Sequence, residues 1–215
     1  MAKECVVLVH GLGRTKLSMF ALQRSLESAG FAVQNLGYPS TRQSIEELSP
    51  AIARAINGCM EAQSRPIHVV THSMGGILLR QYLQDYPDAA IERVVMLAPP
   101  NHGSEIADRY KDTWWYRLAT GPAGQQLGTD PASVPNRLGP AQRQVGVIAG
   151  NKSSDPWFSA LFAGPHDGKV SVASAQLQGM QDFLVVDSGH TWMANSREVS
   201  RQVLSFLKEG KFARE

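Results

Sequence analysis

The chain has 215 residues, of which 43% are hydrophobic and 19% charged, and its formal net charge is +2 at pH 7. This length favours one domain with a full hydrophobic core. The weak and scattered positive charge argues against a nucleic-acid-binding protein or one drawn to anionic membranes. No apolar run approaches the roughly 18 residues of a membrane span. We therefore predict one domain over residues 1–215, with no transmembrane segment and no nucleic-acid partner.

The N-terminal residues and the two cysteines give information on the cellular compartment of the protein. The first predicted strand, Cys5–Val9 (CVVLV), begins within five residues of the N-terminus and leaves no room for a signal peptide, which predicts a cytoplasmic protein. Cys5 and Cys59 are interpreted as small buried hydrophobic residues rather than as a disulfide. No C-x-x-C motif or Cys/His cluster indicates zinc, and neither a metal nor a cofactor is predicted.

The predicted strands are short apolar runs separated by helical patterns. They lie at Cys5–Val9, Phe31–Leu36, Ile67–Thr71, Arg93–Ala98, Val145–Ala149 and Phe183–Val186. Uniformly apolar strands are typical of a sheet that is covered on both faces. Strands that alternate with helices indicate parallel pairing. The sequence therefore predicts a three-layer α/β fold, with a compact, mainly parallel sheet of about six strands and helices on both faces.

One segment with apolar residues at helical spacing contains an internal proline. Apolar residues recur at helical spacing over 45–59, and Ser44 and Glu47 have the spacing of a capping box at its start. Pro50 lies inside this segment and predicts either a kink or a new helix with Ser49 as its cap.

The stretch from about 101 to 144 is the one irregular part of the chain. It is rich in Gly and Pro and contains Trp114, Trp115 and Tyr116. Long segments of this kind in compact domains are often binding loops or lids, so we predict a lid or binding segment here.

The most informative segment is Val69–Gly76 (VVTHSMGG), in which an apolar strand runs directly into Ser73 and a helix begins at once. It resembles the nucleophile elbow, G-x-S-x-G, in which a sharp turn exposes the serine Oγ above the sheet. Thr71 stands where the first glycine of that motif belongs. The alternative is that Ser73 and Gly75 form an ordinary turn at a helix N-terminus.

A second motif, His10-Gly11-Leu12-Gly13, directly follows the first strand. It resembles the H-G oxyanion motif of lipases and esterases. By this resemblance the backbone amides of Leu12 and Met74 are the oxyanion donors, and His10 and Gly11 line the substrate site. The alternative is a glycine turn with a structural histidine.

The candidates for the general base and the acid that would act with Ser73 lie further along the chain. In hydrolases with a nucleophile elbow, the triad residues occur along the chain in the order Ser, acid, His. His190 follows the last predicted strand, which is where the base is expected. Residues 167–170 (DGKV) resemble the D-G-x-V element of bacterial lipases, whose aspartate is the triad acid, so Asp167 is the first candidate. Asp155, before a proline, is the second. Asp182 and Asp187 come too late, flanking or ending the last strand.

Further residues are candidates for the substrate pocket. Residues 98–104 (APPNHGS) resemble the T-P-x-H-G-S loop of lipase-like hydrolases, which places His102 at the site. Trp192 and the aromatic residues at 114–116 are candidate walls of an acyl pocket. The alternatives are that this loop packs beneath the lid and caps a helix, and that the aromatic residues belong to the core.

Together these motifs resemble a small bacterial lipase or esterase of the α/β-hydrolase superfamily over nearly the whole chain. The resemblance implies hydrolysis of a small ester or lipid through a Ser-His-Asp triad and an acyl-enzyme intermediate, without metal or cofactor. It leaves open the choice between lipase and esterase, and an acyltransferase or thioesterase that uses the same triad. A catalytically silent binding module is the alternative from another class. The sequence makes no prediction of oligomeric state.

Overall fold

The computed structural model describes residues 3–153 and 156–214. Its centre is a six-stranded sheet in the order β2-β1-β3-β4-β5-β6, with every neighbouring pair parallel. The strands are β1 (Cys5–Val9), β2 (Ala32–Leu36), β3 (Ile67–His72), β4 (Arg93–Leu97), β5 (Gln144–Gly150) and β6 (Asp182–Val186). The predicted fold class is confirmed, and each predicted strand agrees with these bounds to within one residue at either end.

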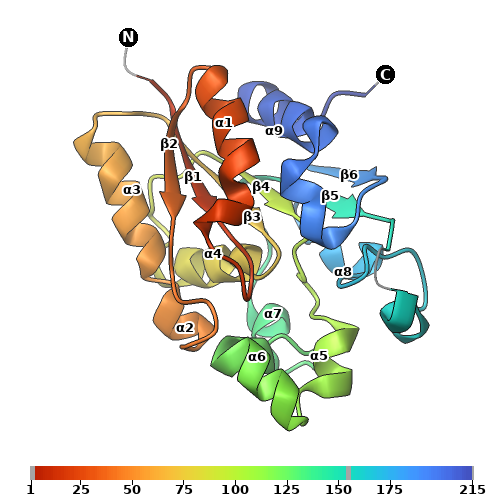
Figure 1. The fold of residues 1–215 in the computed structure, drawn as a ribbon. Helices are drawn as coiled ribbons and strands as arrows, with labels where there is room; N and C mark the ends of the chain where they lie inside the picture. The colour runs from red at the N-terminus through yellow and green to blue at the C-terminus, as the bar shows by residue number, and fades with distance from the viewer. Residues whose placement is uncertain (1–2, 154–155, 215) are drawn as a thin grey trace.

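Helices cover both faces of the sheet because alternate strand residues point to opposite sides. On one face, α1 (Phe20–Ser28) and α9 (Arg197–Glu209) pack against the strands with side chains such as Leu8 of β1 in the core. On the other face lie α3 (Ala51–Glu61) and α4 (Met74–Asp85) (Figure 1). Across the residues that the structure describes, no helix has the length and apolarity to cross a membrane.

The remaining helices lie in the connections between these elements. They are η1 (Lys16–Met19), α2 (Ile45–Leu48), α5 (Glu105–Tyr110), α6 (Trp114–Gln125), α7 (Val134–Arg137), η2 (Pro156–Leu161), α8 (Val172–Ala175) and η3 (His190–Asn195). Figure 1 shows α5, α6 and α7 gathered beyond the carboxyl ends of the strands. The segment over 101–144 is thus largely helical rather than irregular. Its periodicity is hidden in the sequence because Gly121 (φ 63°) and Pro122 break α6.

Pro50 separates two helices instead of kinking one. Ser44 caps α2 through a complete capping box, since its Oγ accepts from the amide of Glu47 and the Glu47 carboxylate accepts from the amide of Ser44. A new helix then starts directly after Pro50. Ser49 is not its cap, because the Ser49 hydroxyl donates back to the carbonyl of Glu46 at 3.2 Å.

The interpretation of the two cysteines as unpaired hydrophobic residues is wrong, because Cys5 and Cys59 form a disulfide. Cys5 opens β1 on the face that α3 covers, and Cys59 lies on the inner side of α3, so packing of the helix brings their Cα atoms to 5.9 Å. Both residues are buried. The sequence shows that each position points inward, but not that both point into the same layer.

Reduction of this disulfide is expected to destabilise the fold. The two residues are 54 positions apart, and a closed loop of that size constrains the unfolded chain by about 4 kcal/mol. Urea unfolding followed by circular dichroism should therefore show a lower midpoint with reductant than without. The Cys5→Ala/Cys59→Ala variant is the control, with a low midpoint that does not respond to reductant. An unchanged midpoint in the parent would contradict the bond.

Candidate active site

Ser73 occupies a sharp turn between β3 and α4. Its backbone has φ 55° and ψ −129°, a conformation that L-residues rarely adopt and that the surrounding structure must hold in place. The amide of Ser73 donates to the carbonyl of Leu97 at 2.8 Å, which anchors the turn to the end of β4. The side chain therefore stands above the carboxyl edge of the sheet, as the elbow motif predicts.

Two glycines allow the elbow to pack closely. A Cβ on Gly75 would lie 2.6 Å from the carbonyl oxygen of Val9, so α4 can approach the end of β1 only without a side chain there. A Cβ on Gly76 would lie 3.3 Å from Oγ1 of Thr71 and 3.0 Å from Cβ of Pro99. The missing side chain at Gly76 thus leaves room for the threonine that replaces the first glycine of the motif.

The side chains of Ser73, His190 and Asp167 form one connected chain of hydrogen bonds. Oγ of Ser73 lies 2.9 Å from Nε2 of His190, and Nδ1 of His190 lies 2.7 Å from Oδ2 of Asp167. His190 opens η3 after β6, while Asp167 lies in the connection between β5 and β6. The amide of His190 also donates to the carbonyl of Asp167 at 3.0 Å, so backbone and side chain fix the pair together.

Asp167 is held as a carboxylate. Its side chain is 1% exposed, and its Oδ1 accepts hydrogen bonds from the amides of Lys169 at 2.9 Å and Val170 at 2.8 Å. Burial alone would raise the pKa of this carboxyl, but the charge and hydrogen bond of His190 and the two amides outweigh burial and lower it. Asp155, the second candidate acid, lies outside the described residues.

His72 is a buried neighbour whose contribution the sequence does not reveal. Its Nε2 donates to the carbonyl of His190 at 2.9 Å, and the two rings lie 4.9 Å apart. Burial, followed by the nearby charge of His190, lowers the pKa of His72 to about 3. A neutral imidazole therefore supports the backbone of the residue that contacts Ser73.

The Gly11–Gly13 loop lies directly beside Ser73. A Cβ on Gly11 would lie 2.9 Å from Cβ of Ser73, and the amide of Gly13 donates to Oγ of Ser40 at 3.1 Å. Among the described residues, the amide of Leu12 has no hydrogen-bond acceptor. Met74 is the first residue of α4, so its amide has no partner within the helix. Both donors are free for an oxygen atom of a bound ligand.

His10 lies beneath this loop rather than in it. The side chain is fully buried and stacks on Tyr38 with ring centroids 4.2 Å apart. Its Nδ1 lies 2.9 Å from the carbonyl oxygen of Gly11, and the Tyr38 hydroxyl donates to the carbonyl of His10. These contacts support the shape of the loop, and His10 does not reach the cavity above it.

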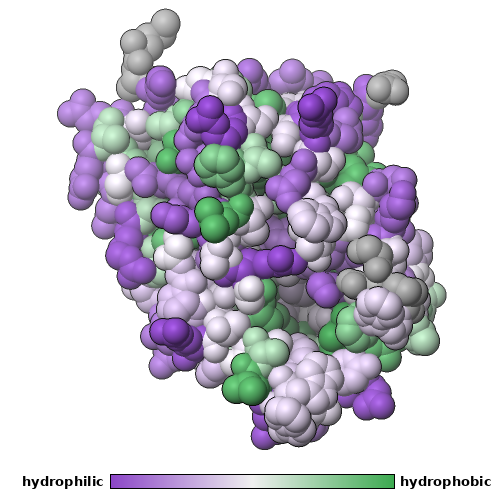
Figure 2. All heavy atoms as spheres, viewed as in Figure 1, coloured by the Kyte–Doolittle hydropathy of each residue, from purple (hydrophilic) through white to green (hydrophobic). Residues whose placement is uncertain are grey.

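A cavity of about 290 Å³ opens above Ser73 and His190. Its walls are mainly apolar, and α6 contributes Trp115, Tyr116 and Ala119. Figure 2 shows this face hollowed, with hydrophobic residues below the hollow and a hydrophilic band above it. Two predicted pocket residues lie elsewhere. Trp192 is 66% exposed, and it is absent from the cavity lining, as is His102.

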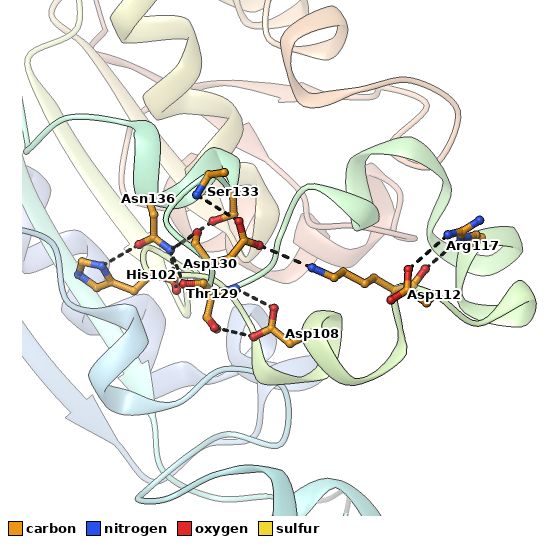
Figure 3. Close-up of polar contacts among 10 residues, drawn as sticks. His102, Asp108, Asp112, Arg117, Thr129, Asp130, Ser133 and Asn136 are labelled. Carbon is orange, nitrogen blue, oxygen red and sulfur yellow. Dashed lines mark hydrogen bonds and ion pairs between the residues drawn. The ribbon is translucent and has the colours of Figure 1, made fainter.

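His102 belongs to a polar network that holds the 101–144 segment together (Figure 3). Nδ1 of His102 lies 3.3 Å from Oδ1 of Asn136, and Nδ2 of Asn136 donates to the carbonyl of Thr129 at 2.9 Å. The carboxylate of Asp108 accepts from the amide and the hydroxyl of Thr129, at 3.0 and 2.6 Å. The ring that the sequence assigns to the substrate site instead links α7 to the loop after β4.

The described residues include no group of three or more His, Cys, Asp or Glu side chains that could hold a metal ion. The site offers a hydroxyl, an imidazole and a buried carboxylate connected by hydrogen bonds, beside the backbone amides of Leu12 and Met74.

Comparison with known proteins places this arrangement in context. The model of the alpha/beta hydrolase family matches residues 6–187, which is well over half of the chain. No curated protein sequence matches the chain.

Solved structures resemble the whole fold. A lipase from Bacillus licheniformis, in its mature form, has a TM-score of 0.75 and 20% identity, over 97% of this chain and 92% of that one. A metagenomic carboxyl esterase has a TM-score of 0.71 and 22% identity, over 88% and 65%. Lipase B of Aspergillus fumigatus has a TM-score of 0.70 and 18% identity, over 96% and 53%. At these identities the likeness is one of fold.

Proposed function

This chain belongs to the α/β-hydrolase family, and from that premise we propose that it hydrolyses carboxylic esters with Ser73 as nucleophile, His190 as general base and Asp167 as the orienting acid. The observation that carries the proposal is the unbroken hydrogen-bond chain from Oγ of Ser73 through His190 to Asp167, at 2.9 and 2.7 Å, on the floor of an apolar cavity. Esters and lipids with an apolar acyl group are the substrates that such a cavity accepts.

In the first half of the reaction, Oγ of Ser73 attacks the ester carbonyl and Nε2 of His190 takes the hydroxyl proton. Asp167, whose pKa is lowered, stays ionised and stabilises the imidazolium. The amides of Leu12 and Met74 donate to the tetrahedral oxyanion, and each such donor is worth about 3 kcal/mol at the transition state. The imidazolium then protonates the leaving alcohol, and an acyl-Ser73 ester remains.

In the second half, a water molecule gives its proton to Nε2 of His190 and attacks the acyl carbonyl. Collapse of the second tetrahedral intermediate releases the carboxylic acid, and the proton returns from His190 to Oγ of Ser73. An acceptor alcohol in place of water would make the same site an acyltransferase.

The segment over 101–144 is proposed to cover the acyl-binding part of the site. Tyr116 of α6 is buried on the cavity side, while Trp114 is 76% exposed. The predicted cytoplasmic location remains a prediction, and the disulfide, which is typical of oxidising compartments, weighs against it.

A series of p-nitrophenyl esters tests both the reaction and the cavity. At about 290 Å³ the cavity is at the small end of ligand sites, so kcat/KM is expected to be highest for butanoate or hexanoate and to fall for palmitate. Release of p-nitrophenolate at 405 nm measures the rate, with detergent-dispersed substrate as the control for solubility. No turnover of any ester would contradict the proposed function, whereas a palmitate optimum would contradict only the role given to the cavity.

A further inference from the structure

Among the described residues that line the cavity, the charged side chains are both cationic. Arg14 and Lys169 are the charged side chains that line it, and no carboxylate joins them among the described lining residues. Nζ of Lys169 lies 5.7 Å from the centre of the Phe158 ring. Cationic groups on the wall of an apolar cavity favour a ligand with a negative charge, because a full charge attracts an anion more strongly than a neutral ester.

Arg14 is the cation whose position bears most directly on the reacting group. It follows the Gly11–Gly13 loop, and its Cα is within about 7 Å of that of Leu12, since two trans peptide steps span no more. Its backbone amide donates to the carbonyl of Gly11 at 3.3 Å, which turns the loop beside Ser73. The charge of Arg14 also reaches the floor of the site, where it contributes to the lowered pKa of His72.

The guanidinium of Arg14 makes no hydrogen bond or ion pair with any residue that the structure describes. Arg42 and Arg54 are exposed and likewise have no such partner among the described residues, but Arg14 is the arginine that lines the cavity. A planar guanidinium presents donors in a fork that matches a carboxylate, sulfonate or phosphate. Its exposed position lets a bound anion keep part of its hydration, so the desolvation penalty stays small.

We propose that Arg14 recognises an anionic group on the substrate, so that the enzyme prefers amphiphilic esters with an apolar chain in the cavity and a negative charge at its rim. This inference rests on the proposed ester hydrolysis and adds the class of ester. Arg14 acts as a specificity residue, and the bond-making groups remain Ser73, His190 and Asp167.

Matched substrate pairs test the proposal. The first pair is 4-butanoyloxybenzoate and its uncharged counterpart 4-butanoyloxybenzamide, which differ in a charge on the leaving alcohol. The second is mono-4-nitrophenyl adipate and its terminal amide, which differ in a charge on the acyl group. For each pair, the ratio of kcat/KM for the anionic to the neutral ester is compared between the parent and Arg14→Gln, so that intrinsic reactivity cancels.

The Arg14→Gln change is expected to lower this ratio about tenfold for at least one pair, the size of one charge-assisted hydrogen bond. The loss should lie mainly in KM, and neutral esters should change less than about twofold. Arg14→Lys should retain part of the preference. Raising salt from 20 to 500 mM should reduce the ratio more in the parent than in Arg14→Gln, in which Lys169 is the remaining cation of the described lining.

Arg54→Gln is the matched control, because Arg54 is an exposed arginine on α3, outside the cavity lining, and its loss changes the net charge equally. The inference is overturned if Arg14→Gln changes neither ratio, or if it slows anionic and neutral esters equally, which would assign Arg14 to the shared transition state or to structure. Absence of hydrolysis of all four esters by the parent would instead count against the proposed function itself.

Discussion

Replacing Ser73 with alanine is expected to lower kcat for ester hydrolysis by about 10⁶-fold, the loss seen when the nucleophile of a serine hydrolase is removed. The hydroxyl in contact with Nε2 of His190 is that of Ser73, whose Oγ lies 2.9 Å away, so the variant loses the group that makes the proposed attack. The variant should fold like the parent, because the amide of residue 73 still donates to the carbonyl of Leu97. Stopped assays with p-nitrophenyl butanoate measure the loss, and urea unfolding checks the fold.

A second serine provides the control for this variant. Ser104 lines the same cavity, and its hydroxyl donates to the carbonyl of Lys169 at 2.9 Å. Ser104→Ala should retain most of the activity. A fluorophosphonate probe should label the parent and Ser104→Ala at Ser73, identified by peptide mapping, and should leave Ser73→Ala unlabelled. Activity of Ser73→Ala close to that of the parent would refute the assignment, and a folded parent that resists the probe would favour the silent binding module.

Local pattern was enough to predict the sheet and the position of the elbow. The apolar run Cys5–Val9 coincides with β1, and Ser73 lies directly after β3, because strands buried on both faces are uniformly apolar and can be located from the sequence. The contact between Ser73 and His190 spans 117 positions of the chain. It could be anticipated because parallel strands deliver their carboxyl ends, and the loops that follow them, to the same edge.

Features that depend on packing between layers were not predictable. The Cys5–Cys59 bond requires knowing which face of the sheet α3 covers, and residue patterns do not say so. His102 follows a strand at the catalytic edge, as the loop motif predicts, yet its ring turns to Asn136 within the 101–144 segment. Trp192 follows His190 closely, but its side chain is exposed. In each case the sequence located the residue along the chain but did not determine where its side chain lies.

Asp167→Asn is expected to lower kcat by about 10⁴-fold while leaving the fold intact. The amide oxygen of asparagine can still accept from the amides of Lys169 and Val170, which lie 2.9 and 2.8 Å from Oδ1 of Asp167. The NH₂ group would then face Nδ1 of His190 and donate to it. That tautomer carries its proton on Nε2, so His190 could no longer accept the proton of Ser73.

Asp187→Asn is the matched control, since Asp187 also follows β6 closely but is 76% exposed and forms an exposed ion pair with Lys152 at 3.5 Å. Its activity should stay within about twofold of the parent, because exposed ion pairs contribute little. The same p-nitrophenyl butanoate assay compares the two variants. If Asp167→Asn kept most of the parent activity, the acid would have to be another residue.

The pH dependence of stability gives an independent test of the same carboxylate. The pKa of Asp167 in the folded protein lies below its ordinary value of 3.8. The ionised group therefore stabilises the fold above the unfolded pKa, and this contribution is lost as pH falls through the folded pKa. The free energy of unfolding of the parent, relative to that of Asp167→Asn, should thus decrease when urea titrations are moved from pH 5 to pH 2.5. A difference that stays constant over this range would mean that Asp167 is not a buried carboxylate paired with His190, and the orienting role assigned to it would fail with that result.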